Sequence, residues 1–218
     1  MKNKLDYKIY YKRNLPHIQP ENAILFITYR LAFSLPKEII INLLEKRKSF
    51  DKKLIKINPI ERKKLENTYN KILFKIEDEF LDKYSEEPLW LKKKEIAGIV
   101  IDSLLYNHQK LYDLHFSLIM PNHVHTVLKP LKNKENNYYS IAKIMKEHKS
   151  FSAIESNKIL KRSGQFWHHE SYDHFIRDDE EYYRIKNYVM NNPVKAGLVE
   201  RYEDWNDYIV DVSQSSAL

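Results

Sequence analysis

The 218-residue sequence contains no cysteine and only three glycines, Gly98, Gly164 and Gly197. The lack of cysteine excludes disulfides, thiolate zinc sites and a thiol nucleophile. Three scattered glycines exclude a Gly-rich phosphate loop of the Rossmann or P-loop type. No apolar run reaches membrane-spanning length, and the N-terminal residues lack the apolar stretch of a signal peptide. We therefore expect a soluble cytoplasmic protein with no membrane partner.

Charge and aromatic residues are abundant. The formal net charge is +7, from 37 basic and 30 acidic residues, and hydrophobic residues make up 43% of the chain. This composition can form a core, and the length fits one domain with elaborations. The basic residues form three groups: Lys2, Lys4, Lys8, Lys12 and Arg13; Lys52, Lys53, Lys56, Arg62, Lys63 and Lys64; and Lys143, Lys146 and Lys149. Such groups favour a polyanionic partner, because neutralising phosphates releases counterions, although a lysine-rich solvated surface is the alternative.

The order of apolar patterns predicts a single α+β domain over residues 1–218, with a mainly antiparallel sheet. The expected strands cover residues 22–31, 110–120, 123–130 and 170–176. The first expected helix begins near Ser34, and three others cover residues 59–83, 92–107 and 138–160. The last expected helix runs from about residue 179 until Pro193 ends it. Residues 1–21 are expected to form a basic arm that orders on DNA, and residues of about 40–105 a helical insertion.

Two helices carry more detailed predictions. Asp178 is the expected N-cap of the last helix, because Glu181 follows three residues later in a variant of the capping box. In the helix over 138–160, one face is predicted to gather apolar residues and a histidine, namely Ile141, Ile144, His148 and Phe151.

The segment MPNHVHTVLKP (120–130) has two histidines one residue apart inside an apolar strand. Side chains alternate along a strand, so His123 and His125 face the same way, with Cα atoms about 6–7 Å apart. Two imidazoles at that spacing can converge on one metal ion. A pair leaves coordination positions open for a substrate oxygen, as a catalytic site requires. Two surface histidines on an edge strand are the alternative.

A second group of residues lies in the segment 178–198. Ile185 and Val189 form the apolar stripe of its helix, and Tyr188 projects from the edge of that stripe. Asn192 follows four residues later on the same side. From that position the tyrosine can reach a site on the adjoining sheet, and the Asn192 amide oxygen can supply a third ligand to the metal ion. The chain has 16 tyrosines, and simple packing is the ordinary explanation for one at a helix edge.

Three motifs in the same order resemble a known family. MPNHVH (120–125) is similar to the His-hydrophobic-His motif of HUH endonucleases. FWHHESYDHFIRDDEEYYRIKNYVMNNPVKAGLV (166–199) resembles the C-terminal signature of REP-associated tyrosine transposases, except that His168 stands where that signature has glutamine. LPHIQPENAILFITYRLAFSLP (15–36) is similar to the opening strand of one branch, and SSA (215–217) also fits. The resemblance runs from about residue 12 to the C-terminus.

The resemblance implies an RRM-like or ferredoxin-like antiparallel sheet with helices packed on it, the HUH endonuclease fold. It also implies a transposase-like enzyme that binds hairpin-forming single-stranded DNA and cuts it through a 5′-phosphotyrosine, using one tyrosine and a divalent ion, Mg²⁺ or Mn²⁺. On that basis His123 and His125 are metal ligands, Asn192 the third ligand and Tyr188 the nucleophile. The protein is expected to act as a monomer, with a dimer left open, and to associate with the nucleoid when DNA-bound.

Further residues are candidates for DNA contacts. Trp167 is expected to stack on an extruded base, with core packing as its alternative. The expected phosphate contacts are Arg177, Lys143, Lys146, Lys149 and Lys195. An ion pair with Asp178 or Asp179 is the alternative for Arg177. A rival metal site would combine the side chains of His169, Glu170, Asp173 and His174.

Two other functions remain open at this point. One keeps the fold but makes the protein a non-catalytic regulator that binds DNA hairpins. The other is a His-x-His metallohydrolase, which needs further His, Asp or Glu ligands at strand ends and does not need Tyr188.

Overall fold

The computed structural model describes residues 7–8, 10–12, 16–54, 57–83 and 88–212. The chain divides into two compact units. Residues 1–32 and 88–218 form the larger unit, and residues 33–87 form the smaller one. No helix of the described residues is both long and apolar enough to cross a membrane.

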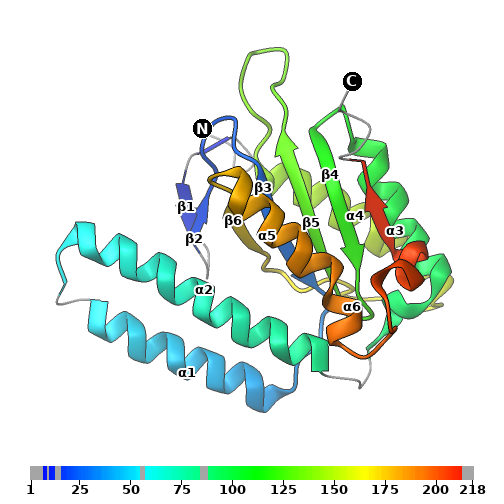
Figure 1. The fold of residues 1–218 in the computed structure, drawn as a ribbon, viewed down its shortest axis with the longest axis horizontal. Helices are drawn as coiled ribbons and strands as arrows, with labels where there is room; N and C mark the ends of the chain where they lie inside the picture. The colour runs from blue at the N-terminus through cyan, green and yellow to red at the C-terminus, as the bar shows by residue number, and fades with distance from the viewer. Residues whose placement is uncertain (1–6, 9, 13–15, 55–56, 84–87, 213–218) are drawn as a thin grey trace. The chain divides into compact units, whose positions relative to one another are not determined.

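The larger unit is built on a five-stranded antiparallel sheet with strand order β6-β3-β5-β4-β7 (Figure 1). Its strands are β3 (Leu25–Arg30), β4 (Tyr112–Ile119), β5 (His123–Pro130), β6 (Tyr172–Phe175) and β7 (Ile209–Asp211). The 3-10 helices η1 (Trp90–Lys92) and η2 (Tyr202–Tyr208) belong to the same unit. The predicted α+β class and antiparallel sheet are confirmed, as are the strands expected around residues 22–31, 110–120, 123–130 and 170–176.

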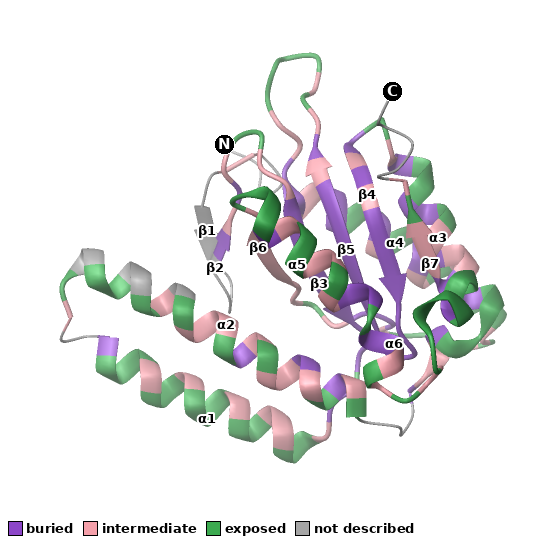
Figure 2. Cartoon of the chain, in the orientation of Figure 1, coloured by how far each residue is buried: buried purple, intermediate pink, exposed green. Residues whose placement is uncertain are grey.

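Helices cover both faces of this sheet, so its central strands are buried on both sides (Figures 1 and 2). The helices are α3 (Lys94–Asn107) and α4 (Ile141–Ile159) on one face, and α5 (Asp179–Met190) and α6 (Asn192–Lys195) on the other. Alternation in β3 separates the faces. Thr28 bonds to His125 on the α5 face, whereas Tyr29 bonds to His148 of α4.

The buried stripe of α4 differs from the predicted one at its C-terminal end. Ile141, Ile144 and His148 are buried as expected, but Phe151 is 52% exposed, so its placement on that face was wrong. Beyond His148 the stripe follows steps of four residues, through Ser152 and Ser156. At 3.6 residues per turn, the residue three positions after His148, Phe151, and the residue four positions after it, Ser152, lie on opposite sides of His148 around the helix. The side of Ser152 is buried, so Phe151 faces outward.

The start of α5 follows the predicted capping pattern. The Asp178 carboxylate accepts a hydrogen bond from the Glu181 amide at 2.7 Å, and the Glu181 carboxylate accepts from the Arg177 amide at 3.0 Å. The C-terminal end differs from the prediction, because α5 ends at Met190 and Pro193 lies in the first turn of α6. Proline is tolerated there because first-turn amides lack an intrahelical acceptor.

Removing this cap should measurably destabilise the protein. We expect Asp178→Ala to lower the free energy of unfolding by about 1 kcal/mol, because the Glu181 amide loses its acceptor at the positive end of the helix. Urea denaturation measures the change. Asp179→Ala is the matched control, since it removes a neighbouring carboxylate that is not the cap. Equal losses in both variants would assign the effect to charge alone.

The N-terminal segment is paired where it is described. β1 (Tyr10–Lys12) pairs antiparallel with β2 (Pro16–Ile18), in the region where the sequence suggested an arm that orders on DNA. Lys2, Lys4 and Arg13 of that expected arm lie outside the described residues, as does the 215–217 motif.

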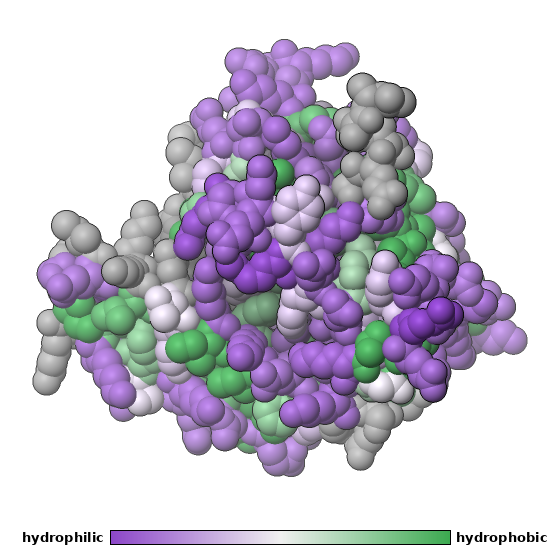
Figure 3. Space-filling model, viewed as in Figure 1, coloured by the Kyte–Doolittle hydropathy of each residue, from purple (hydrophilic) through white to green (hydrophobic). Residues whose placement is uncertain are grey.

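The smaller unit contains two helices, α1 (Lys37–Leu54) and α2 (Pro59–Lys83). They contact each other through the parallel rings of Phe50 and Tyr69, whose centroids lie 3.7 Å apart. In Figure 3 hydrophobic side chains lie among hydrophilic ones on these helices. This unit spans residues 33–87; it lies largely within the region where the sequence predicts a helical insertion of about 40–105, but it begins before that region. Helix α3 belongs to the larger unit because its residues Ile96 and Val100 are buried in that unit's core. Lys56 lies outside the described residues.

Candidate metal centre and tyrosine site

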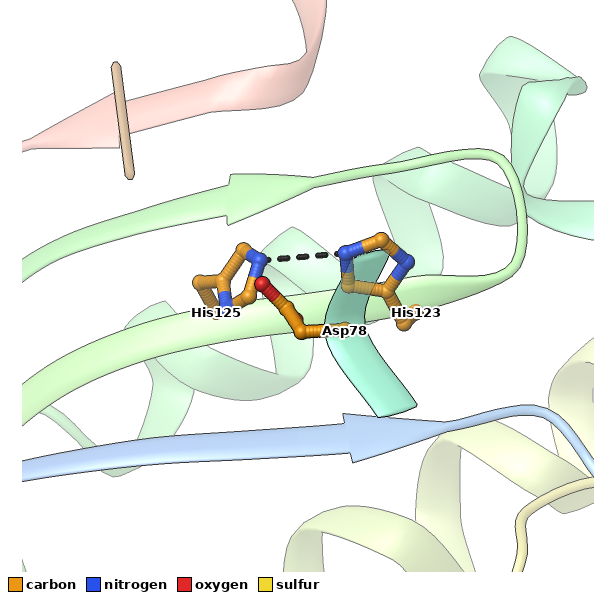
Figure 4. Close-up of side chains that lie close together, drawn as sticks. All are labelled: Asp78, His123 and His125. Atoms are coloured by element: carbon orange, nitrogen blue, oxygen red, sulfur yellow. Dashed lines mark hydrogen bonds between the residues drawn. The ribbon is translucent and has the colours of Figure 1, made fainter. Parts of the chain in front are cut away.

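β5 directs the imidazoles of His123 and His125 to the same face of the sheet. Their Nε2 atoms lie 3.0 Å apart and their rings are nearly perpendicular, at 83° (Figure 4). Both side chains are fully buried, which excludes the alternative of two surface histidines. The sequence predicted a shared face, and the structure brings the two nitrogens close enough to hold one ion. Asp78, also drawn in Figure 4, belongs to α2 of the smaller unit.

The outer nitrogens of both imidazoles are held by hydrogen bonds. His123 Nδ1 lies 2.7 Å from the Asn122 side-chain oxygen, and His125 Nδ1 lies 2.8 Å from Thr28 Oγ1. When each Nδ1 donates to its oxygen, each Nε2 carries a lone pair. In that tautomer both Nε2 lone pairs point to the space between the rings, where one cation can accept both. The two imidazoles are therefore oriented as candidate ligands of one metal ion.

Burial keeps both histidines in the neutral form that binds metals. Burial and, to a smaller extent, the nearby positive charge of Lys195 together lower the pKa of His123 to about 3. Burial also lowers the pKa of His125 well below 6.5, with smaller contributions from His123 and Lys195. At neutral pH neither ring has to lose a proton before it binds a cation.

Asn192, at the start of α6, points its amide into the histidine pair. It is fully buried, and its Nδ2 lies 2.8 Å from His125 Nε2. Its Oδ1 is buried without a hydrogen-bond partner among the described residues. A half-turn of the amide exchanges these atoms and brings the oxygen beside the imidazole nitrogen. The donor set then contains two imidazole nitrogens and one amide oxygen, which fits a divalent transition metal such as Mn²⁺ better than Mg²⁺.

Tyr188 lies on the last turn of α5, beside the same pair. Its ring centroid is 6.1 Å from that of His125, in an edge-to-face arrangement. The Lys195 ammonium lies 5.6 Å from the centre of the Tyr188 ring. The four residues singled out from two distant segments, Tyr188, Asn192, His123 and His125, thus lie in one place. The Tyr188–Asn192 spacing spans the junction between α5 and α6, so both side chains reach the sheet.

Three residues near the pair were missed by sequence reasoning: Asn122, Thr28 and Arg30. Asn122 and Thr28 hold the outer nitrogens of the histidines. Arg30 is the cross-strand partner of His123 and is buried. The sequence does contain a sign of these residues: Thr28 and Arg30 are polar and occupy alternate positions of an otherwise apolar strand. Buried polar residues are unusual unless they have a partner or a function.

Trp167 lies in the core of the larger unit rather than at a base-stacking surface. It is 5% exposed, its Nε1 donates to Ser152 Oγ at 2.9 Å, and its ring packs edge-on against Tyr29 with centroids 4.9 Å apart. Such an indole has no open face for a base. The structure therefore supports the packing alternative.

The basic candidates differ in their surroundings. Lys149 donates to the carbonyls of His168 and Glu170 and to Ser171 Oγ, so it holds the 168–171 segment rather than an exposed phosphate site. Lys146 and Lys195 are exposed. Arg177 is exposed as well, and its guanidinium lies 5.7 Å from the Phe175 ring centre.

The rival metal cluster is divided between two other interactions. Asp173 pairs with His17 of β2, and Glu170 lies 3.7 Å from the other nitrogen of the same histidine. His174 pairs instead with Glu181 at 2.9 Å. His17 was not a candidate in the sequence, because the residues that it contacts lie more than 150 positions away. The His17–Asp173 pair ties β2 to the edge strand β6, and the His174–Glu181 pair ties β6 to α5.

The His17 ion pair predicts a loss of stability at alkaline pH. Its carboxylate partners raise the pKa of His17 to about 9 against the opposing effect of burial. Because the folded pKa exceeds the unfolded value, the stabilisation is fully present below pH 6.5 and is lost as the pH rises through 9. We expect the free energy of unfolding to fall by on the order of 2 kcal/mol between pH 6 and pH 10 from this group. Urea titrations of the wild type and His17→Gln at both pH values measure it; parallel pH profiles would contradict the assignment.

Comparison with known proteins gives a partial relative and a likeness to a solved structure. A protein of Haemophilus influenzae (strain ATCC 51907 / DSM 11121 / KW20 / Rd) named as a REP-associated tyrosine transposase is 30% identical over 92 residues, which cover 40% of this chain. The match covers 52% of that relative, so the chain spans about half of its length. The solved structure of a REP-associated tyrosine transposase bound to a REP hairpin aligns with a TM-score of 0.48 and 14% identity, over 89% of this chain and 78% of that one. No family model matches. The resemblance inferred from the motifs is confirmed by the Haemophilus influenzae relative.

Proposed function

We propose that this protein is a metal-dependent single-stranded DNA endonuclease and strand transferase, which acts beside hairpin-forming repeats. The observation that carries the proposal is the convergence of the two Nε2 atoms, the Asn192 amide and the Tyr188 ring. The similarity to a REP-associated tyrosine transposase supports the same reaction class. We further propose that the protein works as a monomer on DNA of the cytoplasmic nucleoid.

In this proposal Tyr188 is the nucleophile. Its hydroxyl oxygen attacks the phosphorus of a phosphodiester, the new O–P bond forms as the P–O3′ bond breaks, and the phenol loses its proton. The products are a 5′-phosphotyrosine and a strand end that takes up a proton as a 3′-hydroxyl. The covalent ester conserves the bond energy, so a 3′-hydroxyl can later attack it, release Tyr188 and rejoin the strands.

The other residues of the site hold the metal ion, orient its ligands and neutralise the charge of the phosphate. His123, His125 and Asn192 would hold the divalent ion, which supplies polarisation of the phosphate and stabilisation of the departing oxygen. Asn122 and Thr28 fix the orientation of the imidazoles. The exposed Lys195 ammonium, above the Tyr188 ring, is placed to neutralise a phosphate brought to that tyrosine.

A covalent-adduct assay tests the proposal. The protein is incubated with single-stranded oligonucleotides that carry a hairpin, with Mn²⁺ or Mg²⁺, and resolved on denaturing gels. A 3′-labelled strand should remain on the protein as an SDS-resistant adduct, whereas a 5′-labelled strand should be released with a 3′-hydroxyl. EDTA should abolish both. Hairpin binding without adduct would overturn the proposal in favour of a regulator, and metal-dependent cleavage without adduct in favour of a metallohydrolase.

A further inference from the structure

The segment between β5 and α4, residues 131–140, extends beyond the sheet and is exposed at its tip (Figures 1 and 2). It is nevertheless well organised. The Asn133 amide donates to the Asn137 carbonyl at 2.8 Å, and the Tyr139 amide donates to the Leu131 carbonyl at 2.9 Å. A loop held by its own backbone bonds presents its side chains in fixed positions.

This loop forms one wall of a cavity of about 420 Å³, within the range of roughly 300–1,000 Å³ that is typical of ligand sites. We call it the tyrosine pocket; its lining includes Tyr7, Tyr138, Tyr139, Asn137, Ser140 and Lys143. The rings of Tyr7 and Tyr138 lie 5.9 Å apart at 46°. All three tyrosine side chains are partly exposed, so their rings are accessible from the pocket.

Two lysines accompany the tyrosines. The Lys132 ammonium lies 5.1 Å from the centre of the Tyr138 ring, and the Lys143 ammonium 4.8 Å from that of Tyr139. Aromatic rings that stack on bases, beside cations that contact phosphates, are the combination that binds single-stranded nucleic acid without a fixed sequence. Glu135 also lines the pocket, and the Lys143 ammonium lies 4.0 Å from the Glu147 carboxylate, so a bound phosphate would compete with that carboxylate for Lys143.

A buried glutamine preorganises the pocket. The Gln19 side chain donates to the Tyr139 carbonyl at 2.8 Å and accepts from the Ile141 amide at 2.9 Å. The Gln19 carbonyl accepts from the Tyr7 hydroxyl at 2.9 Å. One residue therefore fixes the N-terminal tyrosine, the loop and the start of α4. Preorganisation lowers the entropy that a ligand would lose on binding.

The tyrosine pocket is separate from the candidate metal centre. It follows the C-terminal end of β5, whereas His123 and His125 lie at the N-terminal end of the same strand. At about 3.3 Å per residue, the five residues from His125 to Pro130 alone span roughly 16 Å. A group bound in the pocket is therefore distant from the bond that Tyr188 would cut.

We propose that the tyrosine pocket binds an unpaired nucleobase of single-stranded DNA, with Lys132 and Lys143 on the adjacent phosphates. This inference rests on the proposed function for its substrate class. The pocket would hold the strand away from the reacting phosphate and thereby fix which segment reaches Tyr188.

Binding can be measured without cleavage. Tyr188→Phe protein in EDTA is titrated with a fluorescent single-stranded oligonucleotide, and anisotropy gives the Kd. Adding Tyr138→Ala should raise the Kd roughly 5-fold to 100-fold, the range for loss of one stacked base, whereas Tyr138→Phe should keep it within about twofold. The matched control is Tyr106→Ala, an exposed tyrosine of α3 whose ring lies 3.5 Å from the Lys110 ammonium. It should leave the Kd unchanged.

A second readout separates base stacking from charge. An oligonucleotide that carries 2-aminopurine should lose fluorescence when the wild-type pocket stacks on the probe, and Tyr138→Ala should restore that fluorescence. Equal affinities of the Tyr138→Ala and Tyr106→Ala proteins, with folding verified by circular dichroism, would overturn the inference. That result would leave the adduct assay unaffected. Conversely, failure to form an adduct would overturn the proposed chemistry while the pocket's effect on Kd remained.

Discussion

Replacing Tyr188 by phenylalanine should reduce the covalent protein–DNA adduct to background, a loss of at least on the order of 10³-fold. The substitution removes one oxygen and keeps the ring that lies 6.1 Å from the His125 ring, so packing on the sheet is retained. Oligonucleotide binding should remain within about twofold, because the variant removes no charge. Quantitative gels with a 3′-labelled strand measure the adduct, and anisotropy measures binding.

The matched control for Tyr188→Phe is Tyr183→Phe. Tyr183 lies on the same helix, but it is 63% exposed. A mechanism that uses Tyr188 predicts full adduct formation in the Tyr183 variant. Should adduct persist in Tyr188→Phe, another nucleophile would be in use, and peptide mapping of the attached nucleotide would identify it.

The position of the histidine pair could be predicted because it depends on local geometry. A strand alternates with a period of two residues, so His123 and His125 had to share a face wherever the strand lay. The capping of α5 by Asp178 was predictable for the same reason, since the cap and the amide that it accepts from are three residues apart. Such predictions need only the backbone of one element.

The residues that complete the surroundings depend on contacts between distant segments. Thr28 reaches His125 across 97 positions, and the register that pairs β3 with β5 cannot be read from either strand alone. His17 meets Asp173 across 156 positions, and no local pattern connects these two residues. Long-range register is set by the whole core, so it appears only in the assembled sheet.

Trp167 shows a different limit. An indole beside basic residues is compatible with base stacking and with core packing, and the sequence left both open. Ser152 provides a hydrogen-bond acceptor for the indole, and the same step of four residues that buries Ser152 turns Phe151 outward. The choice thus depended on the rotation of α4 against the sheet. Partly exposed tyrosines of the loop after β5 take the stacking position in our proposal.

Removing one imidazole of the pair should abolish tight metal binding. We expect His125→Ala to weaken Mn²⁺ binding by at least about 100-fold, because even residues that only orient a ligand typically contribute 10–100-fold. The substitution also leaves the Asn192 amide without the nitrogen that it contacts at 2.8 Å. Isothermal titration calorimetry and Mn²⁺ EPR measure the affinity directly, independently of DNA cleavage.

Two further variants sharpen that experiment. His115→Ala removes a half-buried imidazole from the neighbouring strand β4, where it contacts Tyr182, and should leave Mn²⁺ binding unchanged. Asn192→Asp replaces a neutral oxygen donor by a charged one and should restore or exceed wild-type affinity, whereas Asn192→Ala should weaken it. Equal Mn²⁺ affinities in His115→Ala and His125→Ala would show that the ion binds elsewhere. The close approach of two buried, neutral imidazoles would then require another explanation. The proposed phosphodiester cleavage would also lack the metal ion that polarises the phosphate.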